Sequence, residues 1–245
     1  MDYRLSAACG SSVGRIRGNN EDSFYFNGYI PNSGSNGIVS LKNTGIDGTC
    51  FCVFDGMGGE EYGEIASFTA ASALKAALGG PDGNILLEDL CSVMSDAVCA
   101  RSQELRAGTM GTTVAMLCFS LGRAYVCNIG DSRIYLLRDN RLRQLSEDHV
   151  EELPPRRRGK PGLTQYLGIP KDELLIEPHT AAYNVRKDDL YLICSDGLTD
   201  MLTDEEIFSC IKKQPGVEKI VEQLILQANR SGGRDNITAL IVKIQ

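Results

Sequence analysis

Four stretches of the chain carry apolar residues at the three- and four-residue spacing of helices. The first, 60–78, is rich in alanine and is followed by Gly79-Gly80-Pro81, a strong helix stop. The second, 85–105, keeps the helical period along its whole length. Two more, 203–211 and 217–228, lie close together near the end of the chain. The pattern therefore predicts two pairs of helices that are far apart in the sequence.

Short apolar runs that end in turn residues predict β-strands between and after these helices. Leu121-Gly122 and Asp139-Asn140 each separate two such runs and predict tight hairpins. Residues 29–48 are rich in Gly, Asn and Ser, so we expect mostly a long loop there. Because strands and helices come in blocks and do not alternate, we expect an α+β fold of antiparallel sheets with helices on their outer faces. The predicted strands are 49–56, 112–120, 123–130, 132–138, 141–145, 189–195 and 236–244.

The composition is that of a folded protein with a surplus of carboxylates. The 245 residues suit one domain, 1–245, and 42% of them are hydrophobic. The net charge of −7 argues against nucleic-acid binding. No apolar run approaches the ~18 residues of a membrane span, and no signal peptide is seen. We therefore expect a cytoplasmic protein that binds neither membranes nor nucleic acid.

The nine cysteines and two histidines narrow the possible chemistry. His149 and His179 are too few for a His-rich zinc site, and no CxxC spacing occurs. Most of the cysteines lie in apolar runs, so we expect reduced thiols in the core. Any catalysis is therefore expected to depend on carboxylates.

Acidic residues repeatedly follow the predicted strands. One such residue alone would be an ordinary turn residue, because Asp and Gly start turns. Several together can converge at one edge of a sheet, where they repel one another unless cations lie between them. Oxygen ligands with few histidines favour Mg²⁺ or Mn²⁺. The residues concerned are Glu21, Asp22, Asp55, Asp131, Asp196, Asp200 and Asp235.

Seven sequence blocks resemble, in their order, the metal-dependent protein phosphatases of type 2C (PPM), and in particular the bacterial branch. The resemblance runs from about residue 6 to residue 242. It implies a four-layer α-β-β-α sandwich and a Mn²⁺- or Mg²⁺-dependent hydrolase of phosphoserine and phosphothreonine. Phosphorylated proteins, the substrates of a Ser/Thr kinase, are the expected partners of a monomeric chain. The blocks are GRIRGNNEDS, VFDGMGG, GTTVAMLCF, NIGDSRIYLL, LTQYLG, LICSDGLTD and GGRDNITALIV.

The resemblance implies a site for two metal ions. Asp55 would bridge both ions, and Asp196 and Asp235 would complete the protein ligands of the first. The Gly56 carbonyl and Glu21 would hold the second. A water between the ions would lose a proton near neutral pH and attack phosphorus in line, without a covalent enzyme intermediate.

Further residues match additional roles in the family. Asp22 would act at the second ion, directly or through a water. Asp131 and Asp200, with Asp196 shared, match the ligands of a third, weaker ion of bacterial relatives. Arg17 matches the arginine that grips the substrate phosphate, because a guanidinium binds two phosphate oxygens at once. The implied catalytic residues are Arg17, Asp22 and Asp55.

The chain departs from the family pattern at two places. Met57 stands where many eukaryotic members carry a histidine proposed to protonate the leaving oxygen, and a thioether cannot donate a proton. The flap segment near 150–166 is shortened and contains prolines and a basic run. This run forms either a solvated loop or a surface that steers phosphorylated segments to the site. Its residues are Arg156, Arg157, Arg158 and Lys160.

The two histidines have different expected positions. His149 lies either near the site or in a structural position, and His179 is expected at the surface.

Two other classes of function fit the sequence less well. A pseudophosphatase, a binding module with the same fold, is disfavoured because every matching ligand position keeps its carboxylate. A nucleotide-binding protein is suggested by the glycines after Asp55, but the chain lacks the GxxxxGK[ST] pattern.

Overall fold

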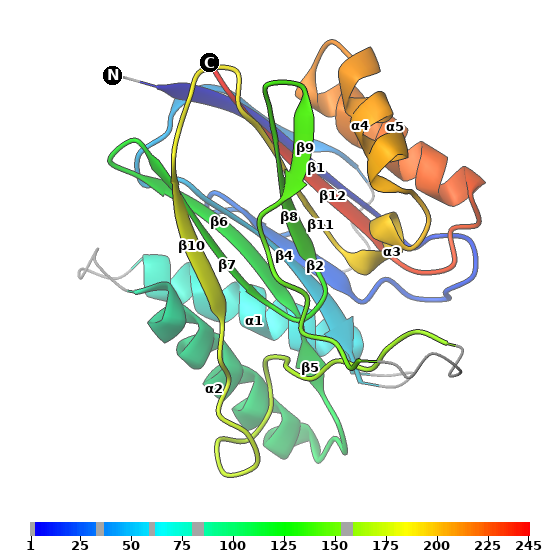
Figure 1. Ribbon diagram of the computed structural model, residues 1–245. Helices are drawn as coiled ribbons and strands as arrows, with labels where there is room; N and C mark the ends of the chain where they lie inside the picture. The colour runs from blue at the N-terminus through cyan, green and yellow to red at the C-terminus, as the bar shows by residue number, and fades with distance from the viewer. Residues whose placement is uncertain (1–2, 33–36, 59–61, 80–85, 153–158) are drawn as a thin grey trace.

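Two antiparallel sheets face each other in the computed structural model, and helices cover their outer faces (Figure 1). The structure describes residues 3–32, 37–58, 62–79, 86–152 and 159–245. The first sheet has the order β3 (Val39–Gly45), β1 (Arg4–Ser12), β12 (Ile237–Ile244), β11 (Leu190–Cys194), β8 (Arg133–Arg138) and β9 (Arg141–Gln144). The second has the order β10 (His179–Asn184), β7 (Arg123–Ile129), β6 (Val114–Ser120), β4 (Cys50–Met57) and β2 (Asp22–Phe26), and short β5 (Gly111–Thr112) pairs with β4.

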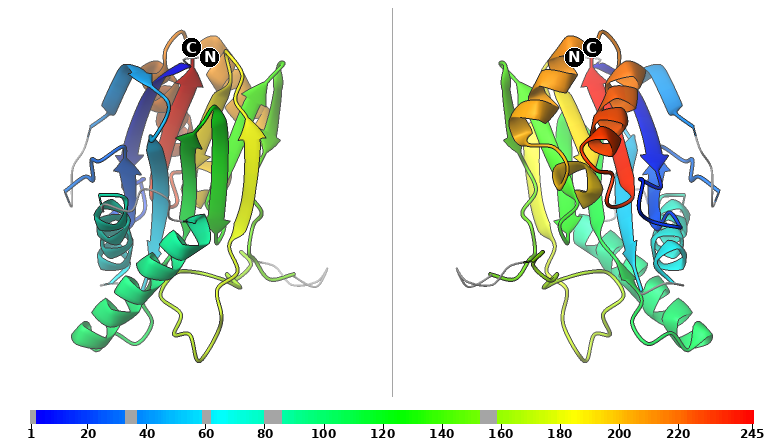
Figure 2. Two further views of the ribbon diagram at one scale, coloured as in Figure 1. Left: turned by 90° about the vertical axis from the view of Figure 1, so that its left-hand side faces the viewer. Right: turned by 90° about the vertical axis from the view of Figure 1, so that its right-hand side faces the viewer.

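Each sheet carries its own helix layer. The helices α1 (Gly63–Leu78) and α2 (Leu87–Leu105) cover the second sheet, with α1 packed on β2 and β4. The first sheet is covered by α3 (Asp196–Thr199), α4 (Asp204–Lys213) and α5 (Val217–Arg230), with α5 packed on β1 and β12. Figure 2 shows α4 and α5 in front of the strands in its right-hand view and behind them in its left-hand view. The predicted α-β-β-α sandwich is therefore confirmed.

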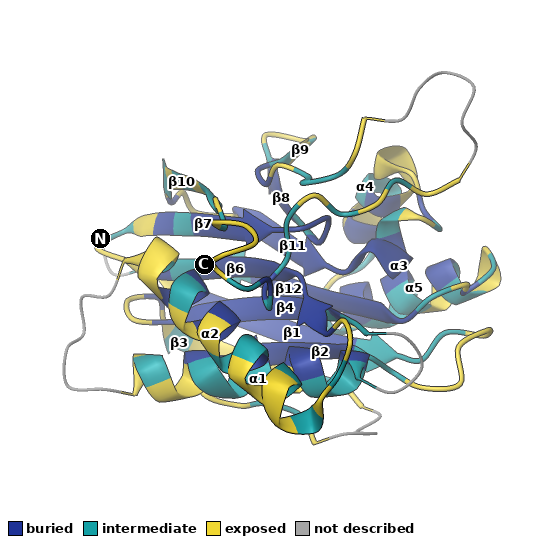
Figure 3. Ribbon diagram, turned by 90° about the horizontal axis from the view of Figure 1, so that it is seen from below, coloured by how far each residue is buried: buried dark blue, intermediate teal, exposed yellow. Residues whose placement is uncertain are grey.

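The apolar strand runs are explained by cores on both faces of each sheet. In β12, Leu240 and Val242 point into the core between the sheets, whereas Ala239 and Ile241 point into the core beneath α5. A strand buried on both faces cannot alternate apolar and polar residues. From below, the central strands are buried, and the exposed residues lie on the helices, on the connecting loops and on the edge strands (Figure 3).

Local signals explain the hairpins and the best-defined helix start. Both predicted hairpin turns are confirmed: Leu121 and Gly122 have φ of 50° and 70°, and Asp139 and Asn140 have φ of 52° and 58°. Positive φ at both central positions matches the twist of a two-residue hairpin. Helix α4 begins after Thr203, whose hydroxyl accepts the Glu206 N–H (3.3 Å) while the Glu206 carboxylate accepts the Thr203 N–H (2.9 Å).

The expectation of a long loop over residues 29–48 is wrong in part. Residues 29–48 contain the strand β3, which pairs with β1 at the edge of the first sheet. Its half-exposed, polar sequence resembles a loop because one edge and one face meet solvent. His179 lies in β10, where its side chain is partly exposed, with Nε2 3.2 Å from the Leu145 carbonyl oxygen and Nδ1 3.4 Å from the exposed Glu147 carboxylate.

One pair of cysteines contradicts the expectation of reduced thiols. Cys50 of β4 and Cys118 of β6 lie opposite each other in register and form a disulfide. The other cysteines of the described residues are free thiols, and Cys91 and Cys127 approach to 3.4 Å between their sulfur atoms. Partners in neighbouring strands cannot be identified from sequence spacing alone, because the register decides which two cysteines meet.

Gly197, the second residue of α3, allows this short helix to touch the chain just before β12. A Cβ at this position would lie 1.9 Å from the Asn236 carbonyl oxygen. We expect Gly197→Ala to lower the free energy of unfolding by about 3 kcal/mol, because the backbone must shift. Gly45→Ala is the matched control, since a Cβ there meets no atom within 4 Å. Urea titrations of both variants test this; equal midpoints would contradict it.

Candidate functional site

One cavity gathers most of the residues that the sequence analysis singled out. It has a volume of about 830 Å³, and we call it the acidic cavity. Four acidic residues reach it from strand ends: Asp55 near the end of β4, Asp131 after β7, Asp196 after β11 and Asp235 before β12. The predicted site residues that line it are Arg17, Glu21, Asp55, Gly56, Asp131, Asp196 and Asp235.

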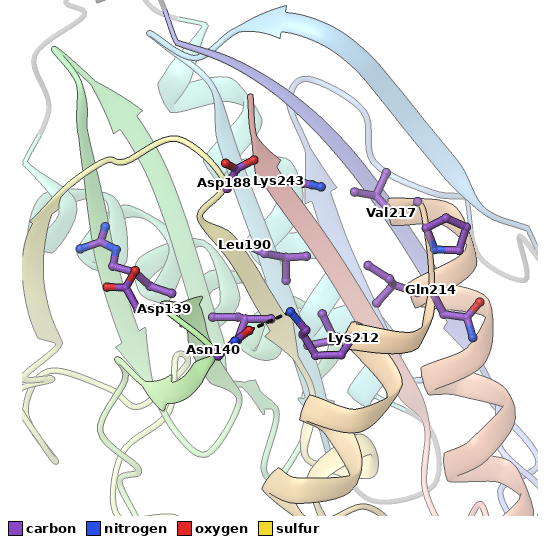
Figure 4. Close-up of a pocket in the computed structure, with 14 residues that line it drawn as sticks. Asp139, Asn140, Asp188, Leu190, Lys212, Gln214, Val217 and Lys243 are labelled. Carbon is purple, nitrogen blue, oxygen red and sulfur yellow. Dashed lines mark hydrogen bonds between the residues drawn. The ribbon is translucent and has the colours of Figure 1, made fainter.

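A second cavity of about 460 Å³ lies between the β8–β9 turn and the connection from α4 to α5 (Figure 4). Its charged groups are mixed, and the Lys212 ammonium donates to the Asn140 side-chain oxygen at 2.8 Å. None of the predicted site residues lines it. The acidic cavity is therefore the candidate functional site.

Asp22 and Asp55 are directly opposite each other in the register of β2 and β4. One carboxylate oxygen of Asp22, Oδ2, accepts hydrogen bonds from Ser195 Oγ (2.7 Å) and Thr238 Oγ1 (2.6 Å). The other, Oδ1, is buried without a hydrogen-bond partner among the described residues. Burial raises the pKa of Asp22 to about 7, although the two hydroxyls favour its ionised form.

The backbone of Asp55 is held from both sides by a threonine pair. Its N–H donates to Thr113 Oγ1 at 3.0 Å, and its carbonyl oxygen accepts the Thr112 hydroxyl at 2.9 Å. Burial raises the pKa of Asp55 well above its ordinary value, and the charges of Asp22 and Asp131 raise it further. The β-sheet thus holds carboxylates together against their mutual repulsion.

Glycines bring Glu21 close to the start of α1. The Gly56 N–H donates to the Glu21 carbonyl oxygen at 3.2 Å, and a Cβ on Gly56 would lie 2.0 Å from the Gly63 carbonyl oxygen. A Cβ on Gly63 would lie 2.5 Å from the Glu21 carboxylate. Burial raises the pKa of Glu21, and the nearby Glu64 raises it further while Arg17 opposes the shift. A larger side chain at position 56 or 63 would therefore push Glu21 away from the start of α1.

Arg17 pairs with a predicted metal ligand. Its guanidinium donates to Asp235 Oδ2 at 2.7 Å, while its side chain remains 53% exposed at the cavity. This hydrogen bond raises the pKa of Arg17 further above its ordinary value. Only one of the five guanidinium N–H groups is needed for the contact, so the others can bind a further anion.

Asn236 is a site residue that the sequence analysis missed. Its side-chain oxygen accepts the Glu21 N–H at 2.7 Å, and its amide nitrogen donates to the carbonyl oxygens of Val13 (3.0 Å) and Asn19 (2.8 Å). One buried amide therefore ties the segment around Arg17 to the start of β12. The only sequence signal is its position directly after Asp235.

Lys160 is a second residue whose role the sequence analysis missed. Its ammonium nitrogen lies 3.6 Å from Asp131 Oδ2 and 3.4 Å from Asp200 Oδ2, and it contacts Asp196 Oδ2 directly. Burial lowers the pKa of Lys160, but Asp131, Asp200 and Asp55 outweigh burial, and the net pKa is raised. The ammonium therefore stays charged. Arg156, Arg157 and Arg158 of the same basic run lie outside the described residues.

Met57 and His149 are placed differently with respect to the cavity. Met57 lines it, and no histidine does so among the described residues. His149 Nδ1 accepts the Gly130 N–H at 3.2 Å, and burial lowers the pKa of His149. The neutral imidazole ring of His149 supports the turn before Asp131, so His149 has a structural role.

The chemistry of the site suits hard divalent cations. Asp22 Oδ1 and Asp196 Oδ1 are buried oxygens without a hydrogen-bond partner within the described ranges, which is costly unless a cation pairs with them. The acidic cavity offers oxygen donors, and neither cysteine nor histidine is among its described lining residues. Within this part of the chain, no three acidic, histidine or cysteine side chains converge on one metal position. The individual ligand roles remain predictions.

A sandwich with oxygen donors gathered at its strand ends is typical of a metal-dependent hydrolase. A profile of the family described as Protein phosphatase 2C matches residues 41–240. The serine/threonine phosphatase stp of Listeria welshimeri is 31% identical, over 94% of this chain and 92% of the relative. Protein phosphatase PhpP of Streptococcus pneumoniae is 31% identical, over 96% of this chain and 95% of the relative. The chain therefore belongs to the protein phosphatase 2C family.

Solved structures agree with this assignment. The crystal structure of the Mycobacterium tuberculosis serine/threonine phosphatase PstP/Ppp superposes with a TM-score of 0.79 at 30% identity, covering 98% of both chains. The PstP catalytic domain in complex with two manganese ions gives a TM-score of 0.78 at 30% identity, covering 99% of both chains. Across the described residues, no helix is long and apolar enough to cross a membrane.

The raised pKa of Asp22 predicts a pH-dependent stability of the metal-free protein. Its folded-state pKa of about 7 exceeds the reference value of 3.8, so the folded state holds its proton longer than the unfolded state. The free energy of unfolding should therefore fall as pH rises from about 4 to about 7, by roughly 1.4 kcal/mol per unit for a single group. Asp22→Asn should flatten this slope in urea titrations with chelator.

The matched control for this measurement is Asp96→Asn, since Asp96 is exposed and pairs with Lys171 at 2.7 Å. The control should keep the slope of the parent protein. Identical slopes for Asp22→Asn and the parent protein would show that Asp22 ionises normally in the fold.

Proposed function

We propose that this chain is a metal-dependent protein serine/threonine phosphatase that hydrolyses phosphoserine and phosphothreonine in other proteins. The observation that carries the proposal is the acidic cavity, where carboxylates from four strand ends meet beside the exposed Arg17. The family and the two-manganese relative support the same activity. Half-exposed side chains such as Lys160 line the cavity, so the cavity is open to solvent. A site that accepts segments of whole proteins must be open in this way.

The proposed ligands divide into two sets around Asp55. Asp196 and Asp235 would hold one Mn²⁺ or Mg²⁺ together with Asp55, and Asp55 would also hold the second. The bound ions would supply Lewis-acid activation of water and offset the charge that develops on the phosphoryl oxygens. The ligands of the second ion would be the Gly56 carbonyl oxygen, Glu21 and, directly or through a water, Asp22.

The chain's own residues bind and orient the substrate phosphate. Arg17 keeps N–H groups available beyond its contact with Asp235, and its planar fork can bind two phosphate oxygens. The contact with Asp235 limits the rotation of the guanidinium and so directs it toward the cavity. Asn236 supports this arrangement because it holds the backbone of Asn19, close to Arg17.

Protonation of the leaving oxygen is assigned to solvent. Met57 cannot donate a proton, and His149 is not among the residues that line the cavity. Serine and threonine alkoxides are strong bases, so water that reaches an open cavity can protonate them as the P–O bond breaks.

A pseudophosphatase is the alternative, and the retained carboxylates argue against it. Every proposed acidic ligand is present at the strand ends, and the buried oxygens of Asp22 and Asp196 without partners favour an ion-binding site. A pure binding module would have no need to hold so many carboxylates together against repulsion.

Hydrolysis of a phosphothreonine peptide should require divalent metal. We expect turnover with added Mn²⁺, none with chelator, and at least a hundredfold loss in Asp196→Asn, because losing a metal ligand removes several kcal/mol of transition-state stabilisation (about 1.4 kcal/mol per tenfold). Asp96→Asn, an exposed site, should keep full activity. No Mn²⁺-dependent turnover would reject the proposed function, and full activity in Asp196→Asn would reject the ligand assignment.

The basic run should affect protein substrates selectively. Replacing Arg156, Arg157 and Arg158 by Ser should raise KM several-fold for a phosphoprotein, because long-range attraction of acidic segments is lost. The kcat/KM for a small aryl phosphate should stay unchanged, and raised salt should remove the difference. Equal effects on both substrates would count against steering.

A further inference from the structure

Lys160 places one ammonium group among three carboxylates at one side of the acidic cavity. Each of Asp131, Asp196 and Asp200 presents its Oδ2 to this nitrogen. An ammonium has three N–H donors and no acceptor, so the number of donors equals the number of carboxylates. These three carboxylates are the set that the family resemblance matches to a third metal ion.

The loop that carries Lys160 is anchored close to this lysine. Val150 and Leu163 form a β-bridge, the Glu151 N–H donates to the Gly162 carbonyl oxygen (2.9 Å), and the Thr164 N–H donates to the His149 carbonyl oxygen (2.9 Å). Lys160 lies two residues before this ladder. The backbone on its C-terminal side is therefore fixed, which lowers the entropy lost when the side chain reaches the carboxylates.

The surroundings favour a cation that is already part of the chain. The side chains of Asp131 and Asp196 are each only 11% exposed, so their charges are expensive without a positive partner. A divalent ion such as Mg²⁺ must shed tightly held water and find near-octahedral ligands, whereas a tethered ammonium has no such geometric demand. Once the ammonium is in place, it repels a divalent ion from the same carboxylates.

We propose that Lys160 acts as a built-in cation that takes the place of the third metal ion, so that this chain binds two divalent ions and not three. The inference rests on the proposed two-metal function. Lys160 pairs with Oδ2 of Asp196 and leaves Oδ1, the buried oxygen without a partner, for the first metal ion. Asp131 and Asp200 then serve as partners of the lysine and not as metal ligands.

The direct test is the number of Mn²⁺ ions bound per chain. The metal-stripped protein would be titrated with Mn²⁺ by calorimetry, and bound metal counted after gel filtration. We expect two ions for the parent protein and for Lys160→Arg, which keeps the charge. Lys160→Met keeps the length of the side chain and removes its charge. We expect this variant to bind a third Mn²⁺ ion, with an affinity at least tenfold higher than that of the parent protein for a third ion.

Controls separate the lysine from general effects of charge and folding. Lys171→Met removes an exposed lysine that pairs with Asp96 and should still bind two ions. Lys160→Gln is a second neutral variant in case Lys160→Met does not fold, and circular dichroism checks both. Because Lys160 is 45% exposed, we expect either replacement to fold.

The outcomes distinguish this inference from the proposed function. Three tightly bound ions in the parent protein, or two in both neutral variants, would overturn the role of Lys160 and leave the two-metal phosphatase intact. No Mn²⁺ binding by the parent protein would overturn the proposed function and the inference together. Two ions in the parent and three in a neutral variant would support both.

Discussion

The repulsion between carboxylates that the two sheets hold together is the constraint on which the site depends. Asp22 and Asp55 face each other because the β2–β4 register leaves no other arrangement. Their burial and proximity raise both pKa values, so the fold alone provides a place where negative charge is unfavourable until a cation arrives. The stability of the sandwich supports this arrangement, since three apolar cores hold the strands in register.

Positive groups from the chain meet this charge on two sides. Arg17 contacts Asp235 on one side, and Lys160 lies among Asp131, Asp196 and Asp200 on the other. Arginine is suited to binding phosphate as well, whereas lysine supplies a compact point charge. The net charge of −7 is therefore unevenly distributed, and the acidic cavity is partly neutralised before any metal ion binds.

The elements that were predicted well share a local cause. Continuous apolar runs marked the central strands because these are covered on both faces, and paired residues with positive φ marked the hairpins. The strand β3 was missed because an edge strand with a polar face has the composition of a loop. The Cys50–Cys118 disulfide was missed because its partners are 68 residues apart and meet only through the β4–β6 register.

The amino-acid sequence by itself determined the types of element, the acidic turns after the strands and the resemblance to type 2C phosphatases. Only the tertiary structure decided which of those groups touch. Asn236 reaches Glu21 across 215 positions, and Lys160 reaches Asp131 and Asp200 from a loop that the sequence marked only as basic. Local patterns report the preferences of neighbouring residues, whereas contacts between distant segments follow from sheet register and packing, which depend on the whole chain.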